Sequence, residues 1–203
     1  GEDGRPLRPA ILYSDARGEQ EAHAVVSQIG AESIRSFSAN QFTLAATGAK
    51  LMWLKVHEPG VYAKTATVVS GAKDYVAYAL TGVHATDPTN GATTGLMNVH
   101  TRDWESPFVR EIGLREDMLP RISASAAKVG YVTHAAAGAT GLPEGCPVFC
   151  GAGDAGAASV GAGTVSPERA HCYLGTTGWV ATIDTSVPKS PPEGLNVLCD
   201  PDP

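Results

Sequence analysis

Apolar residues recur along the chain with two spacings, which predict an alternation of helices and strands. A typical helical case is residues 45–58, where apolar side chains stand at Ala49, Met52, Trp53 and Val56. Similar patterns predict further helices at Glu19–Gly30, Lys73–Leu80, Arg102–Ile112, Arg115–Pro120 and His134–Gly141. Short apolar runs predict strands at Pro9–Tyr13, Thr67–Ser70, Lys128–Thr133, Pro147–Cys150, Ala170–Leu174 and Trp179–Ile183. Together they indicate an α/β fold.

The stretches between these segments predict irregular structure. Residues 31–45 are polar with scattered aromatic side chains, and residues 83–100 are rich in Thr, Asn and Gly. We expect the first to be irregular and the second to be a loop or small hairpin. Residues 184–203 hold five prolines and little to pack, so they predict an exposed arm. Ser14 or Asp15 is the expected N-cap of the first helix.

Composition excludes several classes of protein. The 203 residues carry 15 Lys and Arg against 21 Asp and Glu, without a basic block, which argues against a nucleic-acid partner. A hydrophobic content of 43% with 18% charged residues favours a packed core over disorder. Apolar runs fall short of the roughly 18 residues that a membrane span needs, so we expect no membrane contact. Four scattered cysteines predict reduced thiols in a cytoplasmic protein.

A glycine-rich turn, Gly151-x-Gly153-x-x-Gly156, follows a predicted strand and precedes small residues that predict a helix reaching Gly163. Its form matches the fingerprint of an NAD-binding Rossmann oxidoreductase, which is one hypothesis for its function. Two features count against that hypothesis. The acidic residue expected about 20 positions later is absent. Asp154 also lies where the pyrophosphate would bind, and its carboxylate would compete for the same amides.

Asp154 itself suggests a second interpretation of this turn. A helix N-terminus favours a charged carboxylate, and the flanking glycines leave room for a ligand. An aspartate in that setting is well placed as a general base toward an alcohol. Helix capping, a common role of aspartate, is the alternative at this position.

A second turn, Gly175-Thr176-Thr177-Gly178, joins two predicted strands about 20 residues after Asp154. Hydroxyls and free amides between two glycines form a small concavity that suits an anion such as phosphate. The alternative is an ordinary hairpin, because Gly and Thr are common in turns and strands. An aspartate placed as a general base, followed by a turn that suits phosphate binding, indicates phosphoryl transfer to an alcohol.

The ordered motifs resemble those of the FGGY carbohydrate kinases, most closely the xylulokinases. The matching segments run along essentially the whole chain: Ile11–Arg17, Lys50–Leu54, Lys73–Tyr75, Leu80–Gly82, Ala85–Asp87, Arg102–Trp104, Leu119–Pro120, Gly151–Asp154 and Leu174–Gly178. The resemblance implies a ribonuclease H-like, actin-type ATPase fold, here incomplete. Residues 1–169 would be the later part of the first domain, and residues 170–203 the first strands of the second.

The resemblance also implies roles for particular residues. Asp154 would be the catalytic base and a Mg²⁺ ligand. The backbone and hydroxyls of Gly175, Thr176, Thr177 and Gly178 would contact the phosphates of ATP. The sugar would lie near four residues: Asp15, Arg17, Phe42 and Thr43. Lys50 and Trp53 are expected to be structural.

The substrate implied is a sugar or polyol, with a xylulose-like ketose favoured. Xylulokinases commonly carry Asn after the catalytic Asp, whereas this chain has Ala155, so ribulose, gluconate, glycerol and deoxysugars stay open. An Asp-x-Gly-Thr phosphate loop, which normally begins the family's first domain, does not precede Gly1. We therefore expect the isolated chain to be weakly active or inactive. A catalytically inactive actin-like fragment and a homodimer are the remaining alternatives for its role and assembly.

Overall fold

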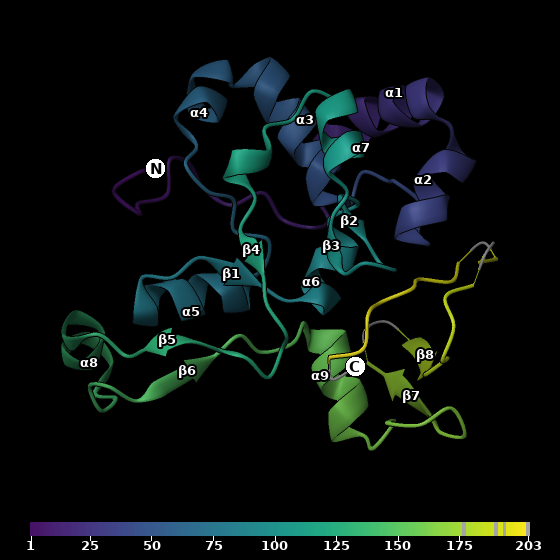
Figure 1. Cartoon of the computed structure of the whole chain (residues 1–203). Helices are drawn as coiled ribbons and strands as arrows, with labels where there is room; N and C mark the ends of the chain where they lie inside the picture. The colour runs from purple at the N-terminus through teal and green to yellow at the C-terminus, as the bar shows by residue number, and fades with distance from the viewer. Residues whose placement is uncertain (176–177, 189–190, 193, 202–203) are drawn as a thin grey trace.

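The computed structural model describes residues 1–175, 178–188, 191–192 and 194–201 (Figure 1). Its helices are η1 (Ala16–Gly18), α1 (Glu19–Ile29), α2 (Ala31–Ser38), α3 (Thr47–His57), α4 (Pro59–Lys64), α5 (Ala72–Thr81), α6 (Pro88–Thr93), α7 (Ser106–Glu111), η2 (Glu116–Met118), α8 (His134–Thr140) and α9 (Asp154–Gly161). Its strands are β1 (Ala85–Thr86), β2 (Met97–Asn98), β3 (Asp103–Trp104), β4 (Arg121–Ile122), β5 (Lys128–Tyr131), β6 (Pro147–Phe149), β7 (Ala170–Leu174) and β8 (Gly178–Thr182).

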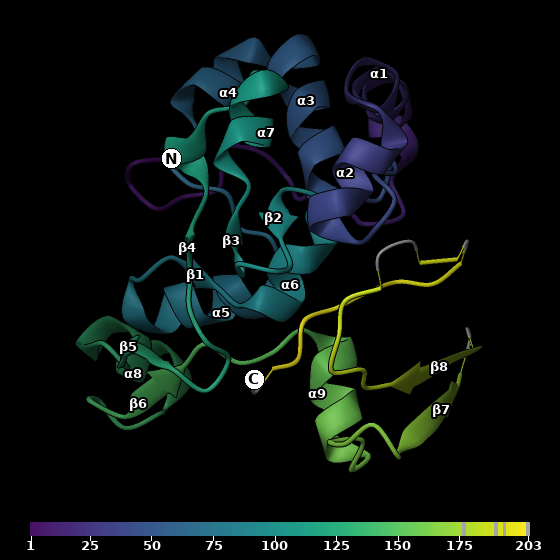
Figure 2. The same cartoon turned by 45° about the vertical axis from the view of Figure 1, so that its right-hand side comes forward.

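The strands pair two by two among the described residues. β1 and β4 are parallel, whereas β2 with β3, β5 with β6, and β7 with β8 are antiparallel. Helices α1–α4 and α7 gather in one group, and α5 and α6 lie below them (Figures 1 and 2). The β5–β6 hairpin with α8 lies on one side of the lower half, and α9 with β7–β8 lies on the other. The mixed α/β architecture is confirmed.

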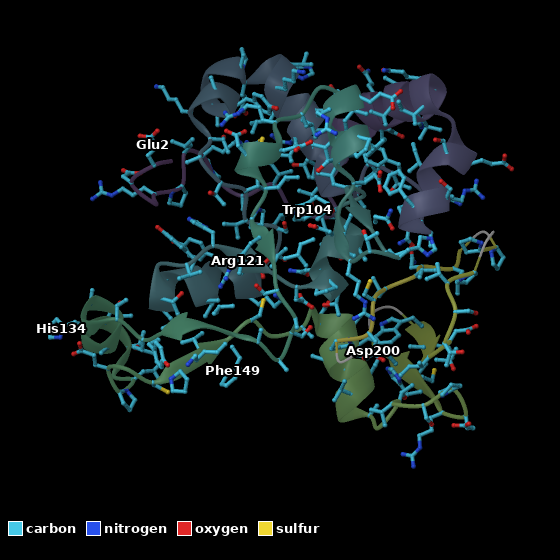
Figure 3. All side chains as sticks on the ribbon, in the orientation of Figure 1. Glu2, Trp104, Arg121, His134, Phe149 and Asp200 are labelled. Carbon is cyan, nitrogen blue, oxygen red and sulfur yellow. The ribbon has the colours of Figure 1, made fainter. Side chains whose placement is uncertain are left out.

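The main hydrophobic core fills the upper helical group. Ala49 of α3, Leu96, and Val109 of α7 are completely buried there, and Met118 of η2 joins them. Trp104 lies at the centre of the molecule (Figure 3), where its indole N–H donates to the Pro120 carbonyl at 2.7 Å. This bond ties β3 to the chain that leads into β4.

Most predicted elements are confirmed with shifts of a few residues at their ends. The helices predicted at Glu19–Gly30 and Lys73–Leu80 correspond to α1 and α5. Gly30 and Gly82 end them with φ angles of 90° and 74°, values that glycine adopts without strain. The strand, turn and helix predicted around Asp154 correspond to β6, residues 150–153 and α9.

Two predicted strands are wrong. Residues 9–13 and 67–70 are irregular, although both runs are apolar. The side chains of Leu12 and Tyr13 are largely exposed, and the Val68 N–H donates to the Met118 carbonyl, which belongs to η2 and not to a strand. A strand needs a neighbouring strand to take its amides and carbonyls, and none lies beside either segment in the described chain.

Other boundaries also differ from the prediction. Residues 31–45 contain α2, because Ile34 and Phe37 lie one turn apart and pack on the core. Residues 83–100 contain α6 as well as two short strands. The helix predicted from Arg102 begins only at Ser106, because Arg102 has a φ of 57° and the next two residues form β3.

The predicted exposed arm is partly docked. The amide of Asn40 brackets Val197, donating to its carbonyl and accepting from its N–H, each at 2.8 Å. Val187, Val197 and Cys199 pack on the small cluster around Met97. The segment that ends the described chain at Pro201 lies beside α9 in both views (Figures 1 and 2). The segment is therefore held on the fold by hydrogen bonds to Asn40 together with these apolar contacts.

Candidate active site

Asp154 is the first residue of α9, directly after Gly153, the N-cap. Its side chain is exposed, and Oδ1 accepts a hydrogen bond from the next amide, Ala155 N–H, at 2.9 Å. Among the described residues, the carboxylate forms no other hydrogen bond or ion pair. Asp154 is therefore not the N-cap itself, and its carboxylate is exposed at a helix N-terminus, which favours its charged form.

The loop before Asp154 packs closely on α6. A Cβ atom at Gly153 would lie 3.1 Å from Thr89 Oγ1, and one at Gly156 would lie 3.0 Å from Thr89 Cγ2. Gly151 has a φ of 73°, which favours glycine at this sharp turn. The glycines thus serve close packing of α9 against α6, a use that differs from dinucleotide binding.

The Rossmann hypothesis finds no support in the strand pairing. That fold needs parallel strands joined through the helix that follows the glycine turn. Here β6 pairs antiparallel with β5, and α9 leads into the antiparallel hairpin β7–β8.

The predicted phosphate turn lies at the tip of the β7–β8 hairpin. The two flanking glycines, Gly175 and Gly178, are exposed, and Gly178 pairs with Leu174. Thr176 and Thr177 lie outside the described residues. The hairpin is confirmed, and its contact with phosphate stays a prediction.

Asp15 and Arg17 bind each other. Arg17 donates from Nε and Nη2 to the two oxygens of Asp15 at 2.9 and 2.8 Å, and these hydrogen bonds lower the pKa of Asp15 to about 2. Asp15 also accepts from Arg17 N–H and so caps η1. It was predicted to cap the following helix, α1. The guanidinium lies 4.6 Å from the ring centroid of Trp53, a cation–π contact.

Lys50 of α3 holds the chain segment that leads to Asp15. Its buried ammonium donates to the carbonyls of Leu12 and Tyr13 at 2.6 and 3.0 Å. Burial lowers the pKa of Lys50, and its bonds make it a brace for the irregular chain that leads to Asp15. The structural role expected of Lys50 agrees with these contacts.

Phe42 and Thr43 line a cavity apart from the Asp15–Arg17 pair. Both line an open cavity of about 820 Å³ between α1, α2 and residues 41–44, together with His23 and Arg35. Phe42 is buried and packs edge-on against Phe108, while Thr43 is exposed. Asp15, Arg17 and Asp154 are absent from the described lining of this cavity. The structure thus places the predicted sugar-side residues in two separate pairs.

A buried charged cluster under the Asp154 loop was not assigned a role from the sequence. Lys73 Nζ lies 2.6 Å from Asp74 Oδ1 and 2.9 Å from Asp87 Oδ1. Asp87 is completely buried and also caps α6, accepting from the N–H groups of Thr89 and Asn90. Its only sequence signal was that both pieces, Lys73–Tyr75 and Ala85–Asp87, belong to the family-like motifs.

In this cluster the carboxylate of Asp87 and the ammonium of Lys73 are both charged. Burial opposes the charge of Asp87, but hydrogen bonds from Thr89, Lys73 and Ser125 outweigh it and lower the pKa of Asp87. Burial likewise opposes the charge of Lys73, yet its bonds to Asp74 and Asp87 raise its pKa. Burial raises the pKa of the adjacent Cys150 thiol to about 11, so this cysteine is neutral near pH 7.

The lowered pKa of Asp87 predicts acid sensitivity. An unfolded aspartate takes up its proton near pH 3.9, before the folded one does. The stabilisation from Asp87 is therefore complete above about pH 4 and is lost as the pH falls further toward the folded-state pKa. We expect the free energy of unfolding, measured with urea at pH 5, 4 and 3, to fall less steeply in Asp87→Asn than in the wild type. Parallel pH profiles would contradict this assignment.

The described residues contain no cluster of three or more His, Cys, Asp or Glu side chains that could hold a metal by themselves. Mg²⁺ is commonly held by one or two carboxylates together with phosphates and water. The exposed carboxylate of Asp154 fits that mode of binding.

None of the helices in the described ranges is long and apolar enough to cross a membrane.

A sequence profile of the N-terminal domain of the FGGY family of carbohydrate kinases matches residues 1–161. The chain belongs to the FGGY family of carbohydrate kinases. It is 29% identical over 185 residues to the xylulose kinase of Staphylococcus xylosus, covering 91% of this chain and 38% of that protein. It is 35% identical over 202 residues to an autoinducer-2 kinase of Escherichia coli, covering 98% of this chain and 37% of that protein.

The structural comparison agrees with this assignment to the FGGY family. The crystal structure of xylulose kinase from Rhodospirillum rubrum superposes with a TM-score of 0.92 at 30% identity, over 100% of this chain and 41% of that one. The actin-like ATPase fold, present here in part, is thereby confirmed. This FGGY chain spans about 40% of the length of the relatives it matches.

Proposed function

We propose that the protein phosphorylates a hydroxyl group of a sugar or polyol with ATP, and that Asp154 is the general base. The exposed Asp154 carboxylate at the start of α9 is the single observation that carries this proposal. Membership of a family of carbohydrate kinases supports it. The alternatives of an NAD-dependent oxidoreductase and an inactive fragment have no comparable support.

In this reaction Asp154 removes the proton from the acceptor hydroxyl as that oxygen attacks the γ-phosphorus of ATP. The bond from the γ-phosphorus to the bridging oxygen breaks, ADP leaves, and the proton stays on Asp154 until solvent takes it. Mg²⁺, held by Asp154 and the phosphates, would neutralise phosphate charge. Gly175, Thr176, Thr177 and Gly178 are proposed to contact the phosphates through their amides and hydroxyls.

The sugar side is proposed to include Asp15 and Arg17. Their side chains are 28% and 30% exposed, so outer atoms of the pair stay accessible to sugar hydroxyls. Phe42 and Thr43 are also proposed as sugar-side residues, from the separate cavity that they line. A xylulose-like ketose is the favoured substrate, because the similar proteins from Staphylococcus xylosus and Rhodospirillum rubrum are named xylulose kinases.

Four further features stay predictions: a cytoplasmic location, a boundary between domains at residues 169 and 170, assembly as a homodimer, and the absence of a nucleic-acid partner. None of them alters the chemistry proposed for Asp154. The boundary lies close to the end of the family match at residue 161.

A panel of sugars and polyols tests the function. The protein, expressed from its complete reading frame, is mixed with ATP and Mg²⁺ and each acceptor, and ADP release is recorded. We expect acceptor-dependent ADP release, greatest with a ketopentose. ADP release that no acceptor stimulates would refute the proposed function.

A further inference from the structure

The loop that carries Asp154 rests on α6 through a short chain of hydrogen bonds. Gly153 N–H donates to Thr89 Oγ1 at 2.6 Å, and the Thr89 hydroxyl donates to Asp87 Oδ2 at 2.6 Å. A hydroxyl has a single proton, so donating it to the carboxylate leaves the oxygen lone pairs for Gly153. The residue directly before Asp154 is thus fixed in place through Thr89.

Two more contacts anchor the same loop. Gly151 N–H donates to the Ser125 carbonyl at 2.9 Å, and Ser125 Oγ donates to Asp87 Oδ2 at 2.8 Å. Lys73 Nζ, paired with Asp87, also lies 3.4 Å from the Cys150 carbonyl. Contacts from both ends of the loop therefore converge on one buried carboxylate.

Asp154 and its support differ sharply in burial. Asp87 is 0% exposed and Thr89 is 2% exposed, whereas the Asp154 side chain is exposed and bonds only its own neighbouring amide in the described chain. The position of the Asp154 carboxylate consequently depends on the loop backbone. A functional side chain is held most precisely when the residues that support it are themselves fixed by packing and hydrogen bonds, as Asp87 and Thr89 are here.

We propose that Thr89, Asp87 and Lys73 are positioning residues that set the place of the Asp154 carboxylate relative to the acceptor hydroxyl. This inference rests on the proposed function. None of the three is required to touch the sugar or ATP, because Thr89 and Asp87 act through Gly153, and Lys73 acts through Asp87 and Cys150. Small displacements of a base cost catalytic rate more than substrate binding.

Kinetics of the protein from its complete reading frame test this role. We expect Thr89→Val to lower kcat by about 10- to 100-fold with KM values for acceptor and ATP within about threefold of wild type. Thr89→Ser keeps the hydroxyl and should restore kcat to within about threefold. The matched control is Thr94→Val, since Thr94 is equally buried in the turn after α6 and its hydroxyl bonds Gly91 and Leu96 instead of the loop. Wild-type kcat in Thr89→Val, or equal losses in both valine variants, would overturn the proposal.

Amide hydrogen exchange separates this inference from the proposed function, because it needs no activity. We expect exchange of the Gly153 amide to accelerate about tenfold in Thr89→Val and to stay unchanged in Thr94→Val. Unchanged exchange in Thr89→Val would overturn the positioning role even in an active kinase. Accelerated exchange in a protein without acceptor-dependent ADP release would support the contact with the loop and refute the kinase function.

Discussion

Replacing Asp87 with alanine is expected to lower the free energy of unfolding by about 3 to 5 kcal/mol. The change removes the cap of α6 and leaves the ammonium of Lys73 with Asp74 as its remaining anionic partner. It also leaves buried donors on Thr89 and Ser125 without their acceptor. Urea unfolding at pH 7, followed by tryptophan fluorescence, measures the loss.

Two variants make this comparison specific. Asp117→Ala breaks an exposed ion pair with Arg115 and should cost less than about 1 kcal/mol. Asp87→Asn keeps the size of the side chain and one acceptor oxygen, so its loss should fall between the other two. If Asp87→Ala unfolds at the same urea concentration as Asp117→Ala, Asp87 does not anchor this part of the fold.

Replacing Asp154 with asparagine is expected to lower kcat by about 10²- to 10⁴-fold, the usual contribution of a general base. Asparagine has nearly the same shape, so the KM for the acceptor should change little. Because Asp154 is exposed and makes one bond to its own neighbour, the free energy of unfolding should stay within about 0.5 kcal/mol of wild type. ADP release with saturating acceptor and ATP measures the first effect, and urea unfolding measures the second.

The matched control for Asp154→Asn is Asp103→Asn. Asp103 is also an exposed aspartate that accepts from the next amide, but it lies on β3. Its kcat should equal that of the wild type. An Asp154→Asn protein with a kcat within about threefold of wild type would rule out the role of Asp154 as the base.

Local patterns predicted the elements around Asp154 well. The apolar run, the glycines and the small residues after them correctly indicated a strand, a turn and a helix, and β5 supplies the partner that this strand needs. The strand at residues 9–13 was wrong for the opposite reason. An apolar run forms a strand only beside a partner, and here the ammonium of Lys50 takes two of its carbonyls.

The support beneath the loop could not be predicted from spacing. Lys73, Asp87 and Ser125 are far apart along the chain and come from α5, the start of α6 and the segment after β4. Only the packing of these elements brings their polar groups to one point under Gly153. The sugar-side residues show the same limit, since Phe42 lines a cavity from which Asp15 is absent, and Asp15 pairs with Arg17 elsewhere.

Following the γ-phosphoryl group of ATP by ³¹P NMR tests the central claim most directly. The protein from its complete reading frame is incubated with ATP, Mg²⁺ and a ketopentose, in parallel with Asp154→Asn. We predict a new phosphomonoester signal that requires the acceptor and forms at least about 100-fold more slowly in the variant. Inorganic phosphate as the only product, or a phosphomonoester formed equally fast by both proteins, would contradict a kinase in which Asp154 is the base.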